Sequence, residues 1–161
     1  MHIFATDDES AALHLRPARN GDAFELARLR ALGLVEMELL APPQARAFER
    51  DAARAIFAML RSGELEAWVA ESAGRLVGCA HALFWRRLPY VEGALHAEVA
   101  GVYVEPQLRG NGIATELVRE AIAAAQAAGV RKITLSSTDR ARSLYARLGF
   151  VERVQMQLTK A

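Results

Sequence analysis

Two glycines stand two positions apart, Gly110 and Gly112, directly after Arg109 and before a long Ala-rich run. The stretch, EPQLRGNGIA, follows a predicted strand that ends at Val104 and leads into a predicted helix. Backbone N–H groups in the first turn of a helix are unpaired, and the helix dipole places partial positive charge there. Because glycine has no side chain, a phosphate can approach this backbone closely, and Arg109 adds a cation. The spacing predicts an anion-binding loop, although Gly-x-Gly alone also occurs at ordinary helix entries.

Three further side chains have the chemistry to move protons. Tyr145 lies on the apolar face of a predicted helix, so it should point toward the sheet. His96 and Glu98 are two positions apart in a predicted strand and share one face, with Ala97 and Val99 on the other. Each has a structural explanation as well. The tyrosine fits a core residue with a satisfied hydroxyl, and the pair fits a polar strand face near a sheet edge.

The elements that must position these residues follow from hydrophobic periodicity and turn signals. Residues 1–12 are expected to be a loose leader. Predicted helices cover 20–32, the segment between Pro43 and Gly63, 112–128 and 138–148, and predicted strands cover 14–18, 65–71, 75–85, 94–104, 131–137 and 150–158. This order predicts an α/β sandwich, with a central, mostly antiparallel mixed sheet of about six to seven strands flanked by four helices. The length predicts one domain over residues 1–161.

Composition excludes several classes of protein. The 20 basic and 19 acidic residues give a net charge of +1, which argues against a nucleic-acid surface. No apolar run reaches the roughly 18 residues needed to span a bilayer, so no membrane partner is expected. Cys79 is the one cysteine, which excludes a disulfide framework and favours a cytoplasmic location. His2, His14 and His81 lack metal-ligand spacing with one another, so no metal is predicted.

Two stretches carry a resemblance to a known family. QLRGNG, residues 107–112, fits the Q/R-x-x-G-x-G/A motif of the GNAT superfamily of acyl-CoA N-acyltransferases. ARSLYARLGF, residues 141–150, is similar to its second signature, A-x-x-x-Y-x-x-x-G-F. The resemblance is specific over about residues 65–158 and concerns only element order over residues 13–62. It answers why the loop is bare, since in that family this loop holds the pyrophosphate of acetyl-CoA.

The resemblance implies acetyl-CoA as co-substrate and an N-acetyltransferase that acts on a primary amine by direct attack in a ternary complex. Tyr145 would protonate the thiolate as general acid, and Glu98, or else His96, would be the general base. If neither is the base, the acceptor binds in its neutral form. The residues expected to bind the cofactor are Val102, Tyr103, Val104, Gln107, Leu108, Arg109, Gly110, Asn111, Gly112, Ile113, Ala114, Thr138 and Arg142.

Two departures from the family pattern leave alternatives open. Many members have an asparagine seven residues before the tyrosine, where this chain has Thr138. Thr138 could bond the cofactor or simply cap a helix, and Arg142 could meet a phosphate or be a solvated helix charge. A family strand bulge near Gly101 could also change which residue faces the cleft.

Other functions compete with the enzyme. The same fold could bind acyl-CoA as a sensor or non-catalytic module, or be a plain interaction domain. The acceptor, a small molecule or a peptide amine, is not specified. Glu36 and Glu38 could attract a cationic amine or form a solvated face. A homodimer is a family-level expectation.

Overall fold

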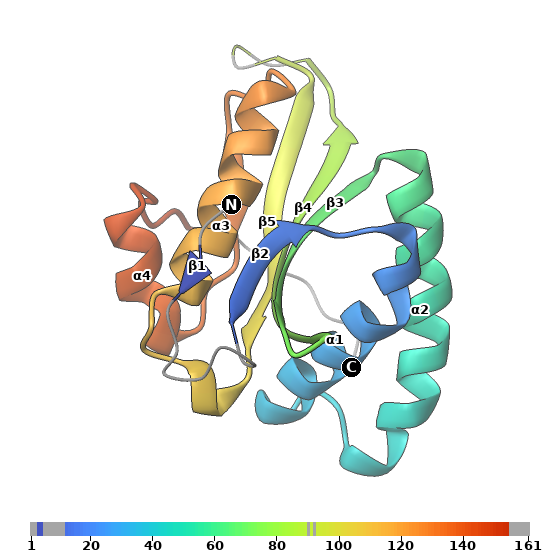
Figure 1. Ribbon diagram of the computed structural model, residues 1–161. Coiled ribbons are helices and arrows are strands. Elements are labelled where there is room, and N and C mark those ends of the chain that lie inside the picture. The colour runs from blue at the N-terminus through green and yellow to red at the C-terminus, as the bar shows by residue number, and fades with distance from the viewer. Residues whose placement is uncertain (1–2, 5–11, 90, 92, 155–161) are drawn as a thin grey trace.

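One six-stranded sheet separates two layers of helices in the computed structural model, which describes residues 3–4, 12–89, 91 and 93–154 (Figure 1). The strands are β1 (Ile3–Phe4), β2 (Leu13–Pro17), β3 (Leu65–Ser72), β4 (Arg75–Arg86), β5 (Leu95–Val104) and β6 (Ile133–Leu135). The α-helices are α1 (Ala23–Glu36), α2 (Ala45–Ser62), α3 (Ile113–Ala127) and α4 (Arg142–Arg147). Short 3-10 turns precede each helix, and among them η4 (Pro106–Leu108) and η5 (Asp139–Ala141) border the site described below.

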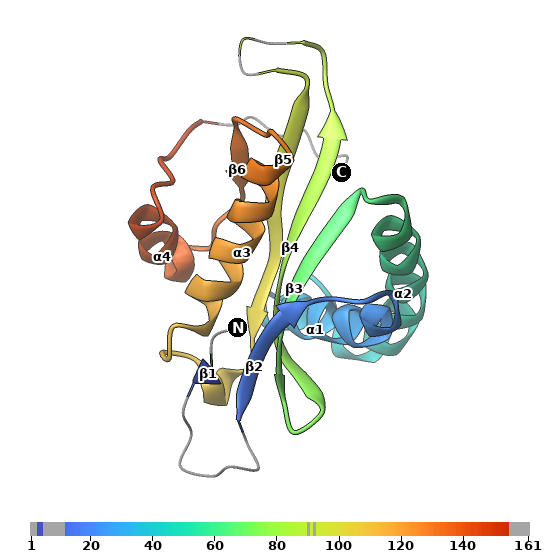
Figure 2. The same ribbon diagram turned by 45° about the horizontal axis from the view of Figure 1, so that its top comes forward.

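The strands lie in the sheet in chain order, and all neighbours are antiparallel except β5 and β6. Helices α1 and α2 cover one face, and α3 and α4 cover the other, as the two views show together (Figure 2). The parallel pairing of β5 and β6 follows from the α3 crossover between them, which returns the chain to the same end of the sheet.

Apolar side chains fill both spaces between the sheet and the helices. On the α3 side the buried cluster includes Val99, Val104, Leu117 and Tyr145. On the α1 side a second cluster contains Leu26, Leu29, Val69 and Cys79. No helix within the described residues is long and apolar enough to cross a membrane.

A bulge in β5 changes which residues face α3: odd-numbered residues do so before it, and even-numbered residues after it. His81 of β4 pairs with Ala100, but Cys79 pairs with Tyr103, so Ala80 lies opposite the two residues at 101 and 102. Gly101 has φ of +58°, in the left-handed region that glycine adopts readily. Before the bulge the odd-numbered residues face α3, and after it Val102 and Val104 do. The bulge expected from the family pattern is therefore present.

The predicted fold class is confirmed, and the main differences lie at the chain ends. Residues 3–4, within the expected loose leader, form β1 and pair with β2. The predicted strand 131–137 is shorter, since only Ile133–Leu135 pair with β5. The predicted last strand falls partly outside the described residues, and residues 150–154 form no strand. The sixth strand of the described sheet is therefore β1, at the opposite edge.

Candidate active site

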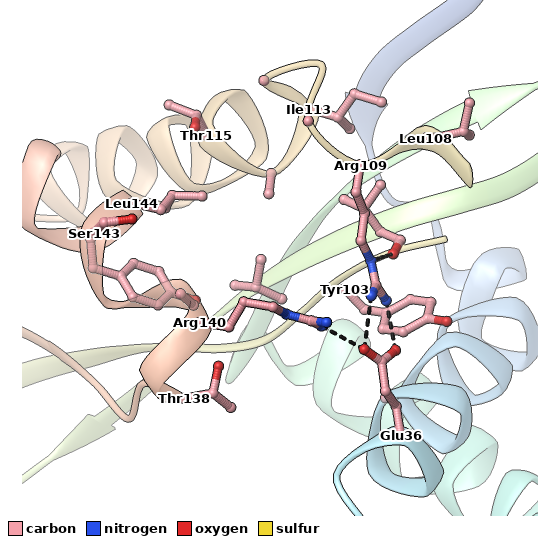
Figure 3. A pocket seen from close by; sticks show the side chains of 18 of the residues that line it. Glu36, Tyr103, Leu108, Arg109, Ile113, Thr115, Thr138, Arg140, Ser143 and Leu144 are labelled. Carbon is pink, nitrogen blue, oxygen red and sulfur yellow. Dashed lines mark hydrogen bonds and ion pairs between the residues drawn. The ribbon is translucent and has the colours of Figure 1, made fainter. Parts of the chain in front are cut away.

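A cavity of about 490 Å³ opens where the end of α1, the loop before α3 and the segment leading into α4 meet the second half of β5 (Figure 3). Its lining comes from these four parts of the chain and includes a small number of charged side chains. The lining residues are Gly33, Glu36, Met37, Val102, Tyr103, Val104, Leu108, Arg109, Gly110, Gly112, Ile113, Ala114, Thr115, Thr138, Arg140, Ala141, Ser143, Leu144, Tyr145 and Arg147.

The edge of β5 that borders the cavity is open. β6 pairs with β5 only at Ala97–Val99, so beyond that point no described strand covers this edge. Val102, Tyr103 and Val104 line the cavity. Backbone N–H and C=O groups need partners when they are covered from water. An extended ligand with amide groups can supply them by lying along the strand.

The glycine loop presents unpaired backbone donors to the same cavity. The first backbone hydrogen bond of α3 runs from Glu116 N to Gly112 O, so the N–H groups of residues 113–115 precede it. Residues 113–115 line the cavity. A Cβ added at Gly110 would meet nothing within 4 Å, but its φ of +84° is unfavourable for other residues. The loop therefore keeps open space in front of a helix N-terminus, which is a geometry that an anion site needs.

Two predicted cofactor-binding side chains hold the loop itself. Gln107 Nε2 donates to Glu105 Oε2 at 2.8 Å, and Asn111 Nδ2 donates to Leu108 O at 3.2 Å. Neither residue lines the cavity. Glu105, which the sequence reasoning missed, is buried and also accepts hydrogen bonds from Arg28 and Arg75. Its carboxylate thus ties the loop to α1 and to β4, and these partners offset the cost of burying it.

An ion-pair cluster lies at the mouth of the cavity. Arg109 donates from Nη1 and Nη2 to the two carboxylate oxygens of Glu36, at 2.8 and 2.6 Å, and Arg140 donates to the same carboxylate (Figure 3). These two arginines lower the pKa of the Glu36 carboxyl to about 2. Glu36 is thus engaged by two cations, and a role in attracting a cationic amine is not favoured. Sequence reasoning missed Arg140, which lies only two residues after Thr138.

Tyr145 reaches the cavity from α4. Its ring is buried and packs edge-on against Phe150, with ring centroids 6.0 Å apart. Burial raises the pKa of its phenol, so the hydroxyl remains protonated at neutral pH. Among the described residues this hydroxyl has no hydrogen-bond partner, and so it is available to a ligand. Of the two other predicted cofactor-binding residues near α4, one lines the cavity and the other does not. Thr138 lines the cavity, whereas Arg142 does not and pairs with Asp139 and Glu152.

The two candidate bases lie on the first half of β5, before the bulge, and neither lines the cavity. Ala97 and Val99 are buried on the α3 side, so His96 and Glu98 share the opposite face, as predicted. His96 is buried against Trp85, with ring centroids 4.6 Å apart, and its Nε2 lies 3.2 Å from Thr134 Oγ1. Burial, with Arg87 and Lys132, lowers its pKa. Glu98 is only half-buried.

Side chains from β4 hold the bulge in place. His81 Nδ1 donates to Ala100 O at 3.3 Å, and Cys79 Sγ donates to Gly101 O at 3.4 Å. Burial lowers the pKa of His81 to about 4, so the ring is neutral at pH 7. Burial raises the pKa of the Cys79 thiol to about 12, which leaves it without thiolate character. Within the described residues, no group of three or more His, Cys, Asp or Glu side chains is placed to hold a metal.

An open strand edge beside a glycine-bearing helix N-terminus, with a buried tyrosine across the cavity, is the arrangement that the motifs at 107–112 and 141–150 imply. The chain belongs to the acetyltransferase (GNAT) family, whose model matches residues 34–150. Members of this family transfer an acetyl group from acetyl-CoA.

The chain is also similar to individual proteins and solved structures. The chain is 36% identical over 89 residues to probable glucosamine 6-phosphate N-acetyltransferase 2 of Oryza sativa subsp. japonica, a match that covers 55% of this chain and 52% of that protein. The match thus spans about half of the relative's length. A predicted acetyltransferase from Clostridium acetobutylicum, solved with acetyl-CoA, has a TM-score of 0.83 at 22% identity and covers 92% of this chain and 96% of its own. Glucosamine-6-phosphate N-acetyltransferase from Arabidopsis thaliana has a TM-score of 0.68 at 16% identity, covering 92% and 97%. At these identities the two structures support the fold alone.

Proposed function

We propose that this protein is an N-acetyltransferase that moves an acetyl group from acetyl-CoA to a primary amine by direct attack. The observation that carries the proposal is the cavity itself. In it, the unpaired N–H groups of residues 113–115, the open edge of β5 and the hydroxyl-bearing ring of Tyr145 border one space. These groups match the three parts of the donor, which are its phosphates, its amide-containing arm and its thioester.

The chemistry needs a proton removed from the amine and a proton given to the leaving sulfur. The amine nitrogen forms a bond to the carbonyl carbon of the thioester, and the carbon–sulfur bond breaks. Tyr145 gives its phenolic proton to the sulfur, which leaves as a thiol. A base takes the proton that the amine loses, and Glu98 is the first candidate because it is only half-buried, whereas His96 is buried and packed against Trp85. Backbone N–H groups of β5 at the bulge would stabilise the charge on the carbonyl oxygen.

A second function is favoured by one observation. Neither base candidate lines the cavity, and the acidic residue that does, Glu36, is paired with two arginines. The same site would therefore also suit a protein that binds acyl-CoA as a sensor without catalysis. The cavity does not specify which amine is the acceptor. Because two similar proteins are named for glucosamine 6-phosphate, a small amino sugar is the first acceptor to assay.

The first test is calorimetric titration of acetyl-CoA into the protein and into Gly110→Asp. The new carboxylate would face the phosphates, and the φ of +84° adds backbone strain, so we expect binding about 100-fold weaker or worse. Gly129→Asp is the matched control, since Gly129 has φ of +83° and follows the far end of α3, roughly 22 Å from the loop. It should bind like the native protein.

Absence of binding by the folded native protein would end both proposals. If the native protein binds, release of free thiol in the presence of amines decides between them. Thiol release that depends on the amine supports the enzyme, and binding without release across amino sugars, amino acids and peptides supports the sensor.

A further inference from the structure

The ion-pair cluster at the mouth of the cavity joins three segments that are distant in sequence. Glu36 is the last residue of α1, Arg109 lies in the glycine loop, and Arg140 lies in the turn before α4. The side chains converge on one point, with the Glu36 carboxylate between the two guanidinium groups (Figure 3). Among the described residues, this carboxylate is the ion-paired link between the last turn of α1 and these two loops, while Arg28, about two turns earlier in α1, pairs with Glu105 before the glycine loop.

The arrangement around the carboxylate is one that also suits a phosphate group. Arg109 binds both oxygens of Glu36 side by side, and this paired geometry serves carboxylates and phosphates equally. Arg109 is held in position independently of Glu36. Its Nε donates to Val104 O at 2.7 Å, and its guanidinium lies 5.4 Å from the centre of the Tyr103 ring. The donor groups of Arg109 would thus remain in place if the anion beside them changed.

The charges of the residues that line the cavity also favour a phosphate-bearing ligand. Among the described residues that line it, Arg109, Arg140 and Arg147 are cationic, and Glu36 is the only acidic one. A phosphate-bearing ligand is therefore attracted by three cations and opposed by one carboxylate. That carboxylate is partly exposed, with 32% of its side-chain surface accessible, so it can leave its position without breaking the core.

We propose that Glu36 competes with a phosphate group of the ligand for Arg109 and Arg140, so that phosphate binding releases the end of α1 from the two loops. The inference rests on the proposed function, because it takes a phosphate-bearing acyl donor as the ligand of this cavity. Two consequences follow. The exchange lowers the affinity for the donor below what the arginines alone would give. It also frees the α1 end, on the helical layer opposite α3, only when the donor is bound.

The test compares Glu36→Gln with the native protein in titrations with CoA, dephospho-CoA and S-acetylpantetheine, which has no phosphate. Without its charge, residue 36 no longer competes for two partly exposed ion pairs, and CoA should bind about five-fold to ten-fold tighter. S-Acetylpantetheine should bind equally to both proteins. An equal gain for dephospho-CoA would place the pyrophosphate at the arginines, and a gain confined to CoA would place the 3′-phosphate there.

Glu38→Gln is the matched control, since it removes the same charge from an exposed neighbour that does not line the cavity. It should leave all three affinities unchanged. Weaker or unchanged binding of CoA by Glu36→Gln would overturn the inference, because Glu36 would then close over the ligand or take no part. Failure of the native protein to bind CoA at all would instead overturn the proposed function and the inference with it. Arg140→Gln should weaken CoA binding and leave S-acetylpantetheine unaffected.

Discussion

The two halves of β5 have different neighbours, and the difference shows how one strand can serve two purposes. From Ala97 to Val99 the strand is paired on both edges, with β4 and β6, and its buried residues pack against α3. From Val102 to Val104 it is paired on one edge only among the described strands, and these residues border the cavity. The bulge separates the two halves. Predicted ligand contacts therefore lie after it, and the candidate bases lie before it.

If the second half of β5 faces the reacting thioester, then removal of the phenol across the cavity has the largest effect. We expect Tyr145→Phe to lower kcat by about 100-fold to 1,000-fold, because no proton is then given to the leaving sulfur. The affinity for CoA should stay within about two-fold of the native value, since the ring that packs against Phe150 is retained. Steady-state kinetics with calorimetry separates the two quantities. Equal loss of binding and turnover would show that the hydroxyl holds the ligand instead.

The substitution Gly101→Ala tests the bulge between the two halves of β5 directly. A Cβ at Gly101 would lie 2.8 Å from Nδ1 of the buried His81 ring, in addition to the strain of φ +58°. We expect the free energy of unfolding to fall by about 3 kcal/mol. Gly74→Ala has a similar φ of +72° but open space around the Cβ, and should cost about 1 kcal/mol. Urea denaturation measures both, and equal losses would mean that the His81 ring gives way easily.

The buried His81 ring, which contacts the bulge, also makes stability depend on pH. His81 has a pKa of about 4 in the folded protein against an ordinary 6.5, so the unfolded chain takes up the proton first as pH falls. The stabilising contribution is complete above the unfolded value and is lost between about pH 6.5 and pH 4. From pH 7 to pH 5 the loss should be about 2 kcal/mol.

The control for this pH dependence is His81→Asn, whose amide can still donate to Ala100 O but does not titrate. The His96 pKa is lowered as well, so His96 contributes in the same direction in both proteins. The difference between the two pH profiles therefore isolates His81. Unfolding curves for native protein and variant that change in parallel with pH would show that the buried ring is not responsible.

Features that depend on local spacing could be predicted from the sequence, whereas contacts between distant residues could not. The glycine loop and Tyr145 lie within short motifs whose meaning depends on local spacing, and the structure places both at one cavity. The Glu36 contacts to Arg109 and Arg140 span 73 and 104 residues, so no local pattern indicates them. Burial of Glu105 is equally hidden, because its partners come from α1, β4 and its own loop. Two-residue β1 is too short to give an alternating pattern.

The smallest expected effect concerns the first half of β5 and tests whether it takes part in the reaction. We expect Glu98→Gln to lower kcat/KM by about ten-fold, because a carboxylate that takes the amine proton through water is replaced by a neutral amide. His96→Gln should change kcat/KM by less than about two-fold, since that ring is packed against Trp85 and bonded to Thr134. The reverse order would make His96 the base. If neither substitution slows the reaction, the amine enters already neutral, and the rate should then follow the neutral fraction of each amine as its own pKa is varied. In that case the first half of β5 would be a structural support for the second half.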